Sequence, residues 1–466
     1  MTESDQITRW RNALQELWGL NRVHAGSEMA KAYRLLMDFY PSCQIIGYPS
    51  GDRCGSWVAP LAWEVNKARL LDPQGKVLCD WHEQKLSVFT YSPPFMGQVS
   101  RSELEEHLFS IPGQPERTPF HFRNQYRQWE QQWGFCLPHK IRENLPEGNY
   151  TVEMDTSLSP GMMEMVEQVH EGESTDSLLL IGHFDHPQMC NDGLVGCLAG
   201  HEAVSRLAGR RTHLTYRMLS TVEIVGSVFY AVREAKKRGV KEALFVATSG
   251  ANAPLVYQST FYGQATVDRL FRHVLRFAKP DTPVKPFRKG GLGNDEIAFD
   301  VQGVQIPCGS IMRAPFSEYH TDLDTPASVH TEQFEEMVDL ISEVIEALEC
   351  HYRLVPRFSG LPCLSSPELD LYLPYPMMSH VVRHGLTMDH PIFAGSQPDL
   401  VEKLFTERPD VFNDLMTALP RMCDGVNTVL DVAERVDLPF RIVERYTKMW
   451  EDKGLLERVW TSPFGS

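Results

Sequence analysis

The stretch Leu178–Gly200, which reads LLLIGHFDHPQMCNDGLVGCLAG, indicates the fold. It opens with an apolar run, Leu178–Ile181, that is typical of a strand buried on both faces. A helical pattern through Leu198 and Val204 follows. Because open α/β sheets carry their chemistry at the carboxyl ends of their strands, the polar residues between these two elements are candidate site residues.

Strand and helix signals alternate after this stretch. Such alternation favours an α/β fold in which a mixed or parallel sheet is sandwiched by helices. The expected strands are Leu214–Leu219, Ala243–Ala247 and Ile306–Ile311, and the expected helices are Ser227–Lys237, Thr266–Phe277 and Thr331–Leu348.

We expect three parts in a chain of 466 residues, because one hydrophobic core rarely organises so many. Residues 1–48, which carry two helical patterns, and residues 116–358 form the α/β domain. Residues 49–115 show short alternating runs between turn residues and form an inserted small β domain. Residues 365–466 form a C-terminal winged-helix domain, because two short helices precede an apolar strand there.

The formal charge of −16 argues against nucleic acid as a partner, since phosphate binding needs a basic face. The first residues do not resemble a secretory signal, and no window has the apolar length of a bilayer span. The cysteines lie scattered without a CxxC pair, which fits reduced thiols. We therefore expect a cytoplasmic protein with no membrane partner, and a homo-oligomer remains open.

Four segments supply groups that bind zinc and related ions, namely imidazoles and carboxylates. Most of them lie close to an apolar run, so strands can deliver all four to one rim of the sheet. The residues are His183, Asp185, His186 and Asp192, then Glu223, then Asp295 and Glu296, and finally His320.

The order of these motifs resembles the zinc aminopeptidases of the M28 type. More closely, the chain resembles the bacterial aminopeptidase-like families DUF4910 and DUF2172. The matching stretches are FHFRNQYRQWEQQWGFCLP, HFDHPQMCNDGLVG, GNDE and MRAPFSEYHTDLDTP. The resemblance extends from about Trp18 to the C-terminus and covers the inserted β domain and the winged-helix tail.

The resemblance implies a role for each matching residue. His183, Asp192 and His320 match metal ligands, and His186 matches a second histidine of the closer family. Asp185 matches the carboxylate that orients the first histidine. Glu223 matches the region of the general base, which takes a proton from water. Asp324 takes the place of a supporting carboxylate, and Asp295 and Glu296 line the cleft around the metal or the substrate amine.

Two departures from the M28 pattern imply one zinc ion rather than two. Val222 precedes Glu223 where the M28 enzymes have two adjacent glutamates. Ala247, Thr248 and Ser249 stand where those enzymes supply a further carboxylate ligand. Two ligands of a metal pair are therefore missing.

Plainer interpretations stay open for several of these residues. His186 precedes a proline and suits a surface or substrate-facing position as well as a ligand. Glu223 suits an ion pair with Arg217. Asp295 and Glu296 suit a turn, and Arg313 suits either a salt bridge or a clamp for a substrate carboxylate.

The sequence thus predicts a zinc-dependent hydrolase, either an aminopeptidase or an amidohydrolase, that cleaves an amide bond next to a free amino group in a small peptide or aminoacyl-type substrate. The alternative is a catalytically altered or non-catalytic metal-binding relative that serves polysaccharide or small-molecule biosynthesis. A third possibility, a DNA-binding regulator, is disfavoured by the even balance of charge in the tail.

Overall fold

A computed structural model describes residues 3–127, 129–289, 293–374 and 386–464. The chain divides into two compact units. The first comprises residues 1–263 and 283–339, and the second comprises residues 264–282 and 340–466. All candidate site residues belong to the first unit.

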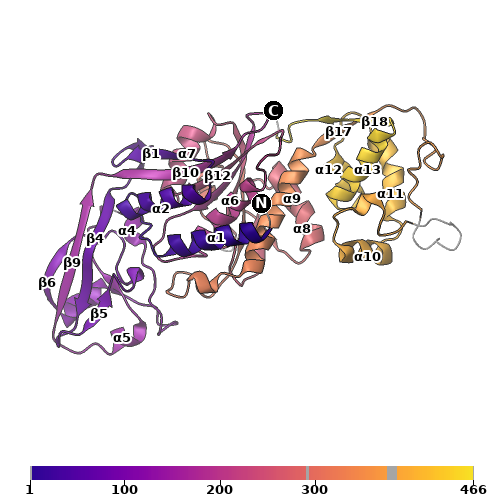
Figure 1. Cartoon of the computed structure of the whole chain (residues 1–466). Helices are drawn as coiled ribbons and strands as arrows, with labels where there is room; N and C mark the ends of the chain where they lie inside the picture. The colour runs from indigo at the N-terminus through magenta and orange to yellow at the C-terminus, as the bar shows by residue number, and fades with distance from the viewer. Residues whose placement is uncertain (1–2, 128, 290–292, 375–385, 465–466) are drawn as a thin grey trace. The chain divides into compact units, whose positions relative to one another are not determined.

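A mixed sheet of eight strands forms the centre of the first unit, as far as the described residues show (Figure 1). The four strands in its middle run parallel, and antiparallel strands flank them on both sides. This confirms the predicted α/β class. In spatial order the strands are β1 (Cys43–Pro49), β10 (Met162–His170), β12 (Thr215–Thr221), β11 (Ser177–His183), β13 (Val240–Val246), β16 (Cys308–Arg313), β14 (Leu255–Gln258) and β15 (Val284–Lys285).

The central strand β11 explains the apolar run in the sequence. Every residue of β11 is buried, because β11 lies between two parallel strands and the crossover helices of parallel sheets cover both faces. Its last residue, His183, pairs in register with Thr221 of β12. The two strands therefore end at the same rim, where Glu223 follows β12 by two residues.

Helices cover the faces of this sheet, as the sequence predicted. The helix α6 (Leu194–Ser205) packs on β11 and β12 and contacts α1 (Glu3–Trp18) on its other side (Figure 1). A Cβ atom at Gly196 would lie 2.3 Å from the carbonyl oxygen of Val246, so only glycine permits this close approach. The other helices of the first unit include α2 (Ser27–Phe39) and α7 (Val225–Tyr230), which continues as the π-helix Ala231–Ala235. The boundary between the two units falls within α9 (Thr331–Glu349).

A second, antiparallel sheet in the first unit has the order β5-β4-β9-β6 (Figure 1). Its core includes Trp63, Tyr150 and Val152, all fully buried or nearly so. The strands are β4 (Ala62–Leu71), β5 (Val77–Asp80), β6 (Phe95–Ser100) and β9 (Asn149–Ser159). Because β9 lies beyond residue 115, the small sheet takes in a strand outside the segment 49–115. The three domain boundaries themselves stay a prediction.

The first unit also contains shorter elements between its long strands and helices. They are β2 (Arg53–Cys54), β3 (Trp57–Val58), η1 (Lys85–Ser87), α3 (Arg101–Leu104), η2 (Glu105–His107), β7 (Leu108–Phe109), α4 (Arg123–Tyr126), β8 (Phe135–Cys136), α5 (His139–Glu143), η4 (Asp295–Ala298) and η5 (Pro326–Ser328).

The second unit is mostly helical. Within it α12 packs on α11 and α13, and β17 pairs with β18 antiparallel. This element order agrees with the two helices and the strand that suggested a winged helix, and the winged-helix assignment itself stays a prediction. The elements are α8 (Thr266–Ala278), β17 (Tyr352–Pro356), η7 (Pro391–Phe393), α10 (Pro398–Glu407), α11 (Val411–Met422), α12 (Val429–Val436), α13 (Phe440–Asp452) and β18 (Leu456–Trp460).

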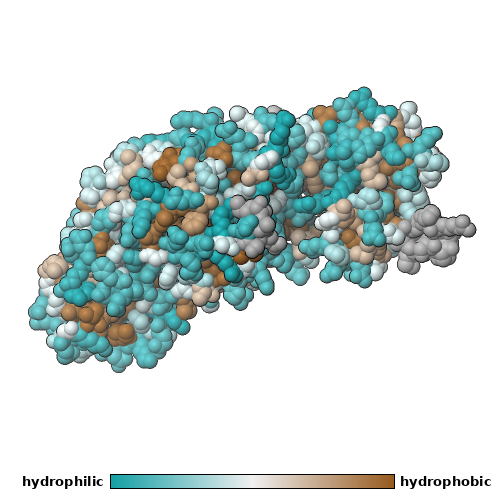
Figure 2. Space-filling model, in the orientation of Figure 1, coloured by the Kyte–Doolittle hydropathy of each residue, from teal (hydrophilic) through white to brown (hydrophobic). Residues whose placement is uncertain are grey.

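The surface is mostly hydrophilic on the face shown in Figure 2, where hydrophobic residues form small separate groups. None of the helices in the described ranges combines the length and the apolar character needed to cross a membrane.

Candidate metal centre

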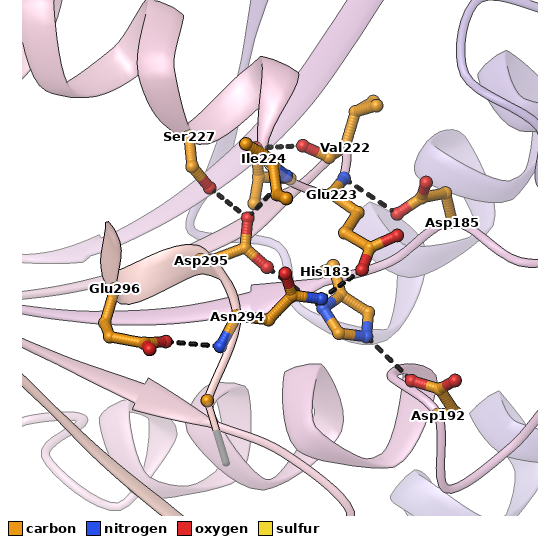
Figure 3. Close-up of polar contacts among 12 residues, drawn as sticks. His183, Asp185, Asp192, Val222, Glu223, Ile224, Ser227, Asn294, Asp295 and Glu296 are labelled. Carbon is orange, nitrogen blue, oxygen red and sulfur yellow. Dashed lines mark hydrogen bonds and ion pairs between the residues drawn. The ribbon is translucent and has the colours of Figure 1, made fainter. Parts of the chain in front are cut away.

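The predicted site residues meet at the carboxyl ends of β11 and β12 (Figure 3). His183 ends β11, and the loop that follows it carries Asp185, His186 and Asp192. Glu223 follows β12, and His320 comes from the segment after β16. Residues from distant parts of the chain thus surround one small volume.

His183 lies between two carboxylates. Its Nε2 atom is 3.0 Å from Oδ1 of Asp192, and its Nδ1 atom is 3.0 Å from Oδ2 of Asp295. Burial lowers the pKa of the His183 imidazole, but the two carboxylates outweigh burial and raise it well above its ordinary value. A positive charge at this position is therefore strongly stabilised.

Asp192 is the point at which the three histidines converge. Its Oδ2 atom lies 2.8 Å from Nε2 of His320 and 3.8 Å from Nε2 of His186. Burial raises the pKa of Asp192, but the charge of His186 and the contacts with His183 and His320 hold it well below its ordinary value. The carboxylate is therefore ionised.

His186 is buried and faces two carboxylates. Its Nε2 atom lies 3.6 Å from Oε2 of Glu223, in addition to its approach to Asp192. Among the described residues, two groups of ligand atoms lie close enough together to hold an ion, and His186 belongs to both: one includes His183 and Asp192, and the other includes Asp185 and Glu223. The sequence left open whether His186 lies at the surface or among the candidate ligands. In the structure its side chain is buried and faces the candidate ligands.

Glu223 is held by two side chains from elsewhere in the chain. Its Oε2 atom accepts a short hydrogen bond from the Tyr126 hydroxyl. Its Oε1 atom accepts one from the side-chain amide of Asn294 (Figure 3). Arg217 instead pairs with Glu167 at 3.3 Å, so the alternative of an ion pair between Arg217 and Glu223 is wrong.

Asp185 does not orient His183, contrary to the expectation. Its Oδ1 atom accepts a hydrogen bond from the Glu223 backbone at 2.9 Å, and its Oδ2 atom lies 3.2 Å from Nε2 of His24. Burial raises the pKa of Asp185, but His186 and His24 outweigh burial and lower it to about 2. The reason for the error is geometric, because the side chain of Asp185 points to the Glu223 backbone and away from the imidazole two residues earlier.

Asp295 instead makes the contact with the His183 ring that was expected of Asp185. Besides contacting His183, it accepts hydrogen bonds from the Ile224 backbone at 2.8 Å and from the Ser227 hydroxyl at 2.5 Å (Figure 3). Glu296 points elsewhere and accepts from Gln258 at 3.1 Å. Of the two acids, the contacts thus join only Asp295 directly to the histidines.

Asp324 supports the loop that carries Asp192. Its two oxygens accept hydrogen bonds from the backbone of Asn191 at 2.8 Å and of Asp192 at 2.9 Å. Burial raises the pKa of Asp324 to about 6. The side chain of Arg313, the other residue left open, pairs with Glu336 and donates to the Ala253 carbonyl, which supports the salt-bridge interpretation.

A cavity of about 370 Å³ opens beside His183 and Asp192. Its wall is largely apolar and includes Phe245, Met312 and Phe316. Ala247 and Thr248, which replace the carboxylate of the M28 pattern, also line it. Cavities of this size bind small molecules.

These side chains fit a bound cation. The Asp192 Oδ2 atom is buried and faces the Nε2 atom of His320 at 2.8 Å and the Nε2 atom of His186 at 3.8 Å. Nitrogen and carboxylate ligands together are the set that zinc prefers, so this donor set matches a zinc ion.

Several residues of the site carry no metal-ligand signal in the sequence. Tyr126 and Asn294 lie in stretches quoted above for the family resemblance, which gave them no role. His24 lies between two helical patterns. Aromatic rings also close the site, because Phe120 packs 5.1 Å from the His186 ring and Tyr319 stacks 3.8 Å from the His320 ring.

The fold is similar to that of known aminopeptidases. A Clostridium acetobutylicum protein, whose name describes a polysaccharide biosynthesis protein with an aminopeptidase-like domain, is 27% identical over 436 residues, which cover 93% of this chain and 92% of the relative. A crystal structure from Clostridium acetobutylicum, of a protein assigned by name to the peptidases, has a TM-score of 0.80 and 24% identity, and the match covers 98% of this chain and 97% of that one.

A zinc aminopeptidase from Bacillus subtilis also matches, with a TM-score of 0.53 and 12% identity over 73% of this chain and 93% of that one. The chain therefore has an aminopeptidase-like fold. The family model of the domain of unknown function DUF4910 matches residues 11–351, well over half of the sequence. The chain belongs to the DUF4910 family.

Proposed function

We propose that the protein is a zinc-dependent hydrolase that cleaves an amide bond next to a free amino group. The observation that carries the proposal is the convergence of His183, His186 and His320 on the single carboxylate of Asp192, next to Glu223 and an apolar cavity. The aminopeptidase-like fold supports the same reaction class. The proposed reaction adds water across the amide and yields a carboxylic acid and an amine.

His183, His186, Asp192 and His320 would hold one zinc ion. When bound, zinc supplies Lewis acidity, which polarises the carbonyl group and makes water a better nucleophile. Carboxylates flank both ring nitrogens of His183. Asp295 fixes its ring and Asp324 fixes the loop of Asp192.

Glu223 is the proposed general base. It accepts the proton from the attacking water and donates it to the leaving nitrogen as the carbon–nitrogen bond breaks. Tyr126 and Asn294 orient its carboxylate through their hydrogen bonds. The apolar wall at Phe245, Met312 and Phe316 excludes water and takes an apolar group of the substrate.

We infer a small substrate rather than a long polypeptide. The cavity volume of about 370 Å³ suits a compact molecule, and the name of the Clostridium acetobutylicum relative points to polysaccharide biosynthesis. An aminoacyl amide is the simplest molecule with the required chemistry.

The test compares zinc-loaded wild type with Glu223→Gln on a panel of aminoacyl amides. We expect turnover by the wild type and a loss of about 100-fold or more in kcat for the variant, which is within the usual range for general-base catalysis. Zinc content is measured for both proteins. Bound zinc without turnover of any amide by the wild type would favour the alternative, a metal-binding protein that is not a hydrolase.

A further inference from the structure

Arg22 is a fully buried arginine in the segment between α1 and α2. Its guanidinium donates hydrogen bonds to four carbonyl oxygens and, in the described contacts, to no carboxylate. The acceptors are Leu17 at 2.7 Å, Trp18 at 3.4 Å, Phe184 at 2.9 Å and Met189 at 2.7 Å. Burial lowers the pKa of Arg22. A buried charge is costly unless it is well hydrogen-bonded, so this arrangement calls for a physical explanation.

Two of these acceptors lie at the ends of the loop Phe184–Met189, which follows His183 and carries His186. A third contact runs in the other direction, because the backbone carbonyl of Arg22 accepts a hydrogen bond from the His186 amide at 2.9 Å. Arg22 therefore contacts the beginning, the middle and the end of this loop.

The loop needs such support because its backbone is strained. His186 has a φ of +92° and Gln188 a φ of +51°. Residues with a side chain rarely adopt positive φ angles, and they do so where the surroundings enforce the conformation. The guanidinium is suited to this task, since its planar fork can bond two carbonyls in fixed directions, whereas a lysine ammonium cannot.

His186 depends on this loop conformation for its place in the metal centre. Its side chain is buried, and its Nε2 atom faces both Asp192 and Glu223. A shift of the backbone at residue 186 would move the imidazole away from both carboxylates. The neighbouring segment contributes a further contact, because His24 lies 3.2 Å from Asp185 of the same loop.

We propose that Arg22 is a positioning residue that fixes His186 in the metal centre. This inference rests on the proposed function, because it assumes that the centre binds zinc. It assigns to the segment between the first two helices a role in metal binding, through the backbone of the loop rather than through direct contact with the ion.

The experiment measures zinc affinity by competition with a chelator and the visible spectrum of the cobalt-substituted protein, which reports ligand geometry. It uses the full chain as Arg22→Lys and Arg22→Met. The matched control is Arg217→Lys, because Arg217 is also largely buried but pairs with Glu167 away from the loop. Far-ultraviolet circular dichroism and thermal unfolding establish that each variant is folded.

We expect both Arg22 variants to bind zinc about 10- to 100-fold more weakly, the effect typical of outer partners of a metal site, and to show an altered cobalt spectrum. The control should keep the wild-type affinity and spectrum. Folded Arg22 variants with wild-type zinc affinity and cobalt spectrum would overturn the inference. So would failure of both variants to fold, because Arg22 would then serve the fold instead. A wild-type protein that binds no zinc would overturn the proposed function itself.

Discussion

The Nε2 atom of His320 lies 2.8 Å from the Oδ2 atom of Asp192, and the same oxygen lies 3.8 Å from the Nε2 atom of His186. The two residues come from segments that are far apart in the sequence, so the fold brings them together. A lone pair of a neutral imidazole and a carboxylate oxygen repel each other at this distance unless a proton or a cation lies between them. The pair therefore defines the position at which we expect zinc.

Asp295 rather than Asp185 is expected to control His183. Substitution Asp295→Asn removes the charge next to Nδ1 of His183, and we expect zinc affinity to fall by about 10- to 100-fold. The neighbouring variant Glu296→Gln is the matched control, because Glu296 contacts Gln258 and the backbone of Asn294 rather than a histidine. Equal zinc affinities for the two variants, measured by chelator competition, would show that the contact with His183 has no such role.

Tyr126 is expected to act through Glu223. The variant Tyr126→Phe removes a hydrogen bond to a charged group, worth about 1.5–3 kcal/mol, so kcat for an aminoacyl amide should fall by about 10- to 100-fold. Tyr150→Phe, which removes a hydroxyl bonded to the Pro146 carbonyl, should leave kcat unchanged. Steady-state kinetics decide, and an unchanged kcat for Tyr126→Phe would exclude this contribution.

Gly193 leaves room for His183. A Cβ atom at residue 193 would lie 2.0 Å from Cδ2 of His183, so Gly193→Ala must displace the imidazole or the loop. We expect at least a 10-fold loss of zinc affinity, in line with other disturbed metal sites. At Gly113 nothing lies within 4 Å of the added atom, so Gly113→Ala should bind zinc normally. Normal zinc binding by both alanine variants would contradict the packing at residue 193.

His201 is expected to make stability depend on pH. It is fully buried between Gln168 and Ser220, each 2.8 Å away, and burial lowers its pKa to about 3. An unfolded histidine titrates near about 6.5, so between these values only the unfolded state binds the proton. The free energy of unfolding should therefore fall as the pH drops from about 6.5 towards 3, by at most about 1.4 kcal/mol per unit.

The measurement for His201 is denaturant unfolding of wild type and His201→Gln at several pH values from 4 to 7. We expect a shallower dependence on pH in the variant, because glutamine does not titrate. The comparison cancels the contributions of all other groups to first order. Parallel stability curves for the two proteins would refute the assignment of a neutral buried imidazole to His201.

The central sheet and the candidate metal ligands could be predicted from the sequence, because an apolar run followed by polar residues is a local pattern. The apolar run before His183 predicts a buried strand. Because parallel neighbouring strands end at the same edge of a sheet, the polar residues after them are expected to meet at that edge. The side-chain partners could not be predicted in the same way. Asp185 and Asp295 have the same side chain, so the sequence does not distinguish them. Only the direction of each side chain in the fold decides which one contacts His183.

Other residues that support the site could not be predicted, because a hydrogen-bond donor or a buried cation has no fixed sequence pattern. Tyr126, in a short helix, donates a hydrogen bond to Glu223. Arg22, in the segment after α1, donates a hydrogen bond to the Phe184 carbonyl of the loop Phe184–Met189. The strand β9 likewise joins the small sheet by pairing with β4 and β6, and pairing between distant strands leaves no mark in either strand alone.

The most direct test of the central claim is anomalous diffraction at the zinc absorption edge from a crystal of the zinc-loaded protein. We predict one strong peak per chain, about 2.0–2.2 Å from a carboxylate oxygen of Asp192 and from Nε2 of both His186 and His320. A crystal with no peak at Asp192, or with its zinc bound elsewhere, would contradict the account.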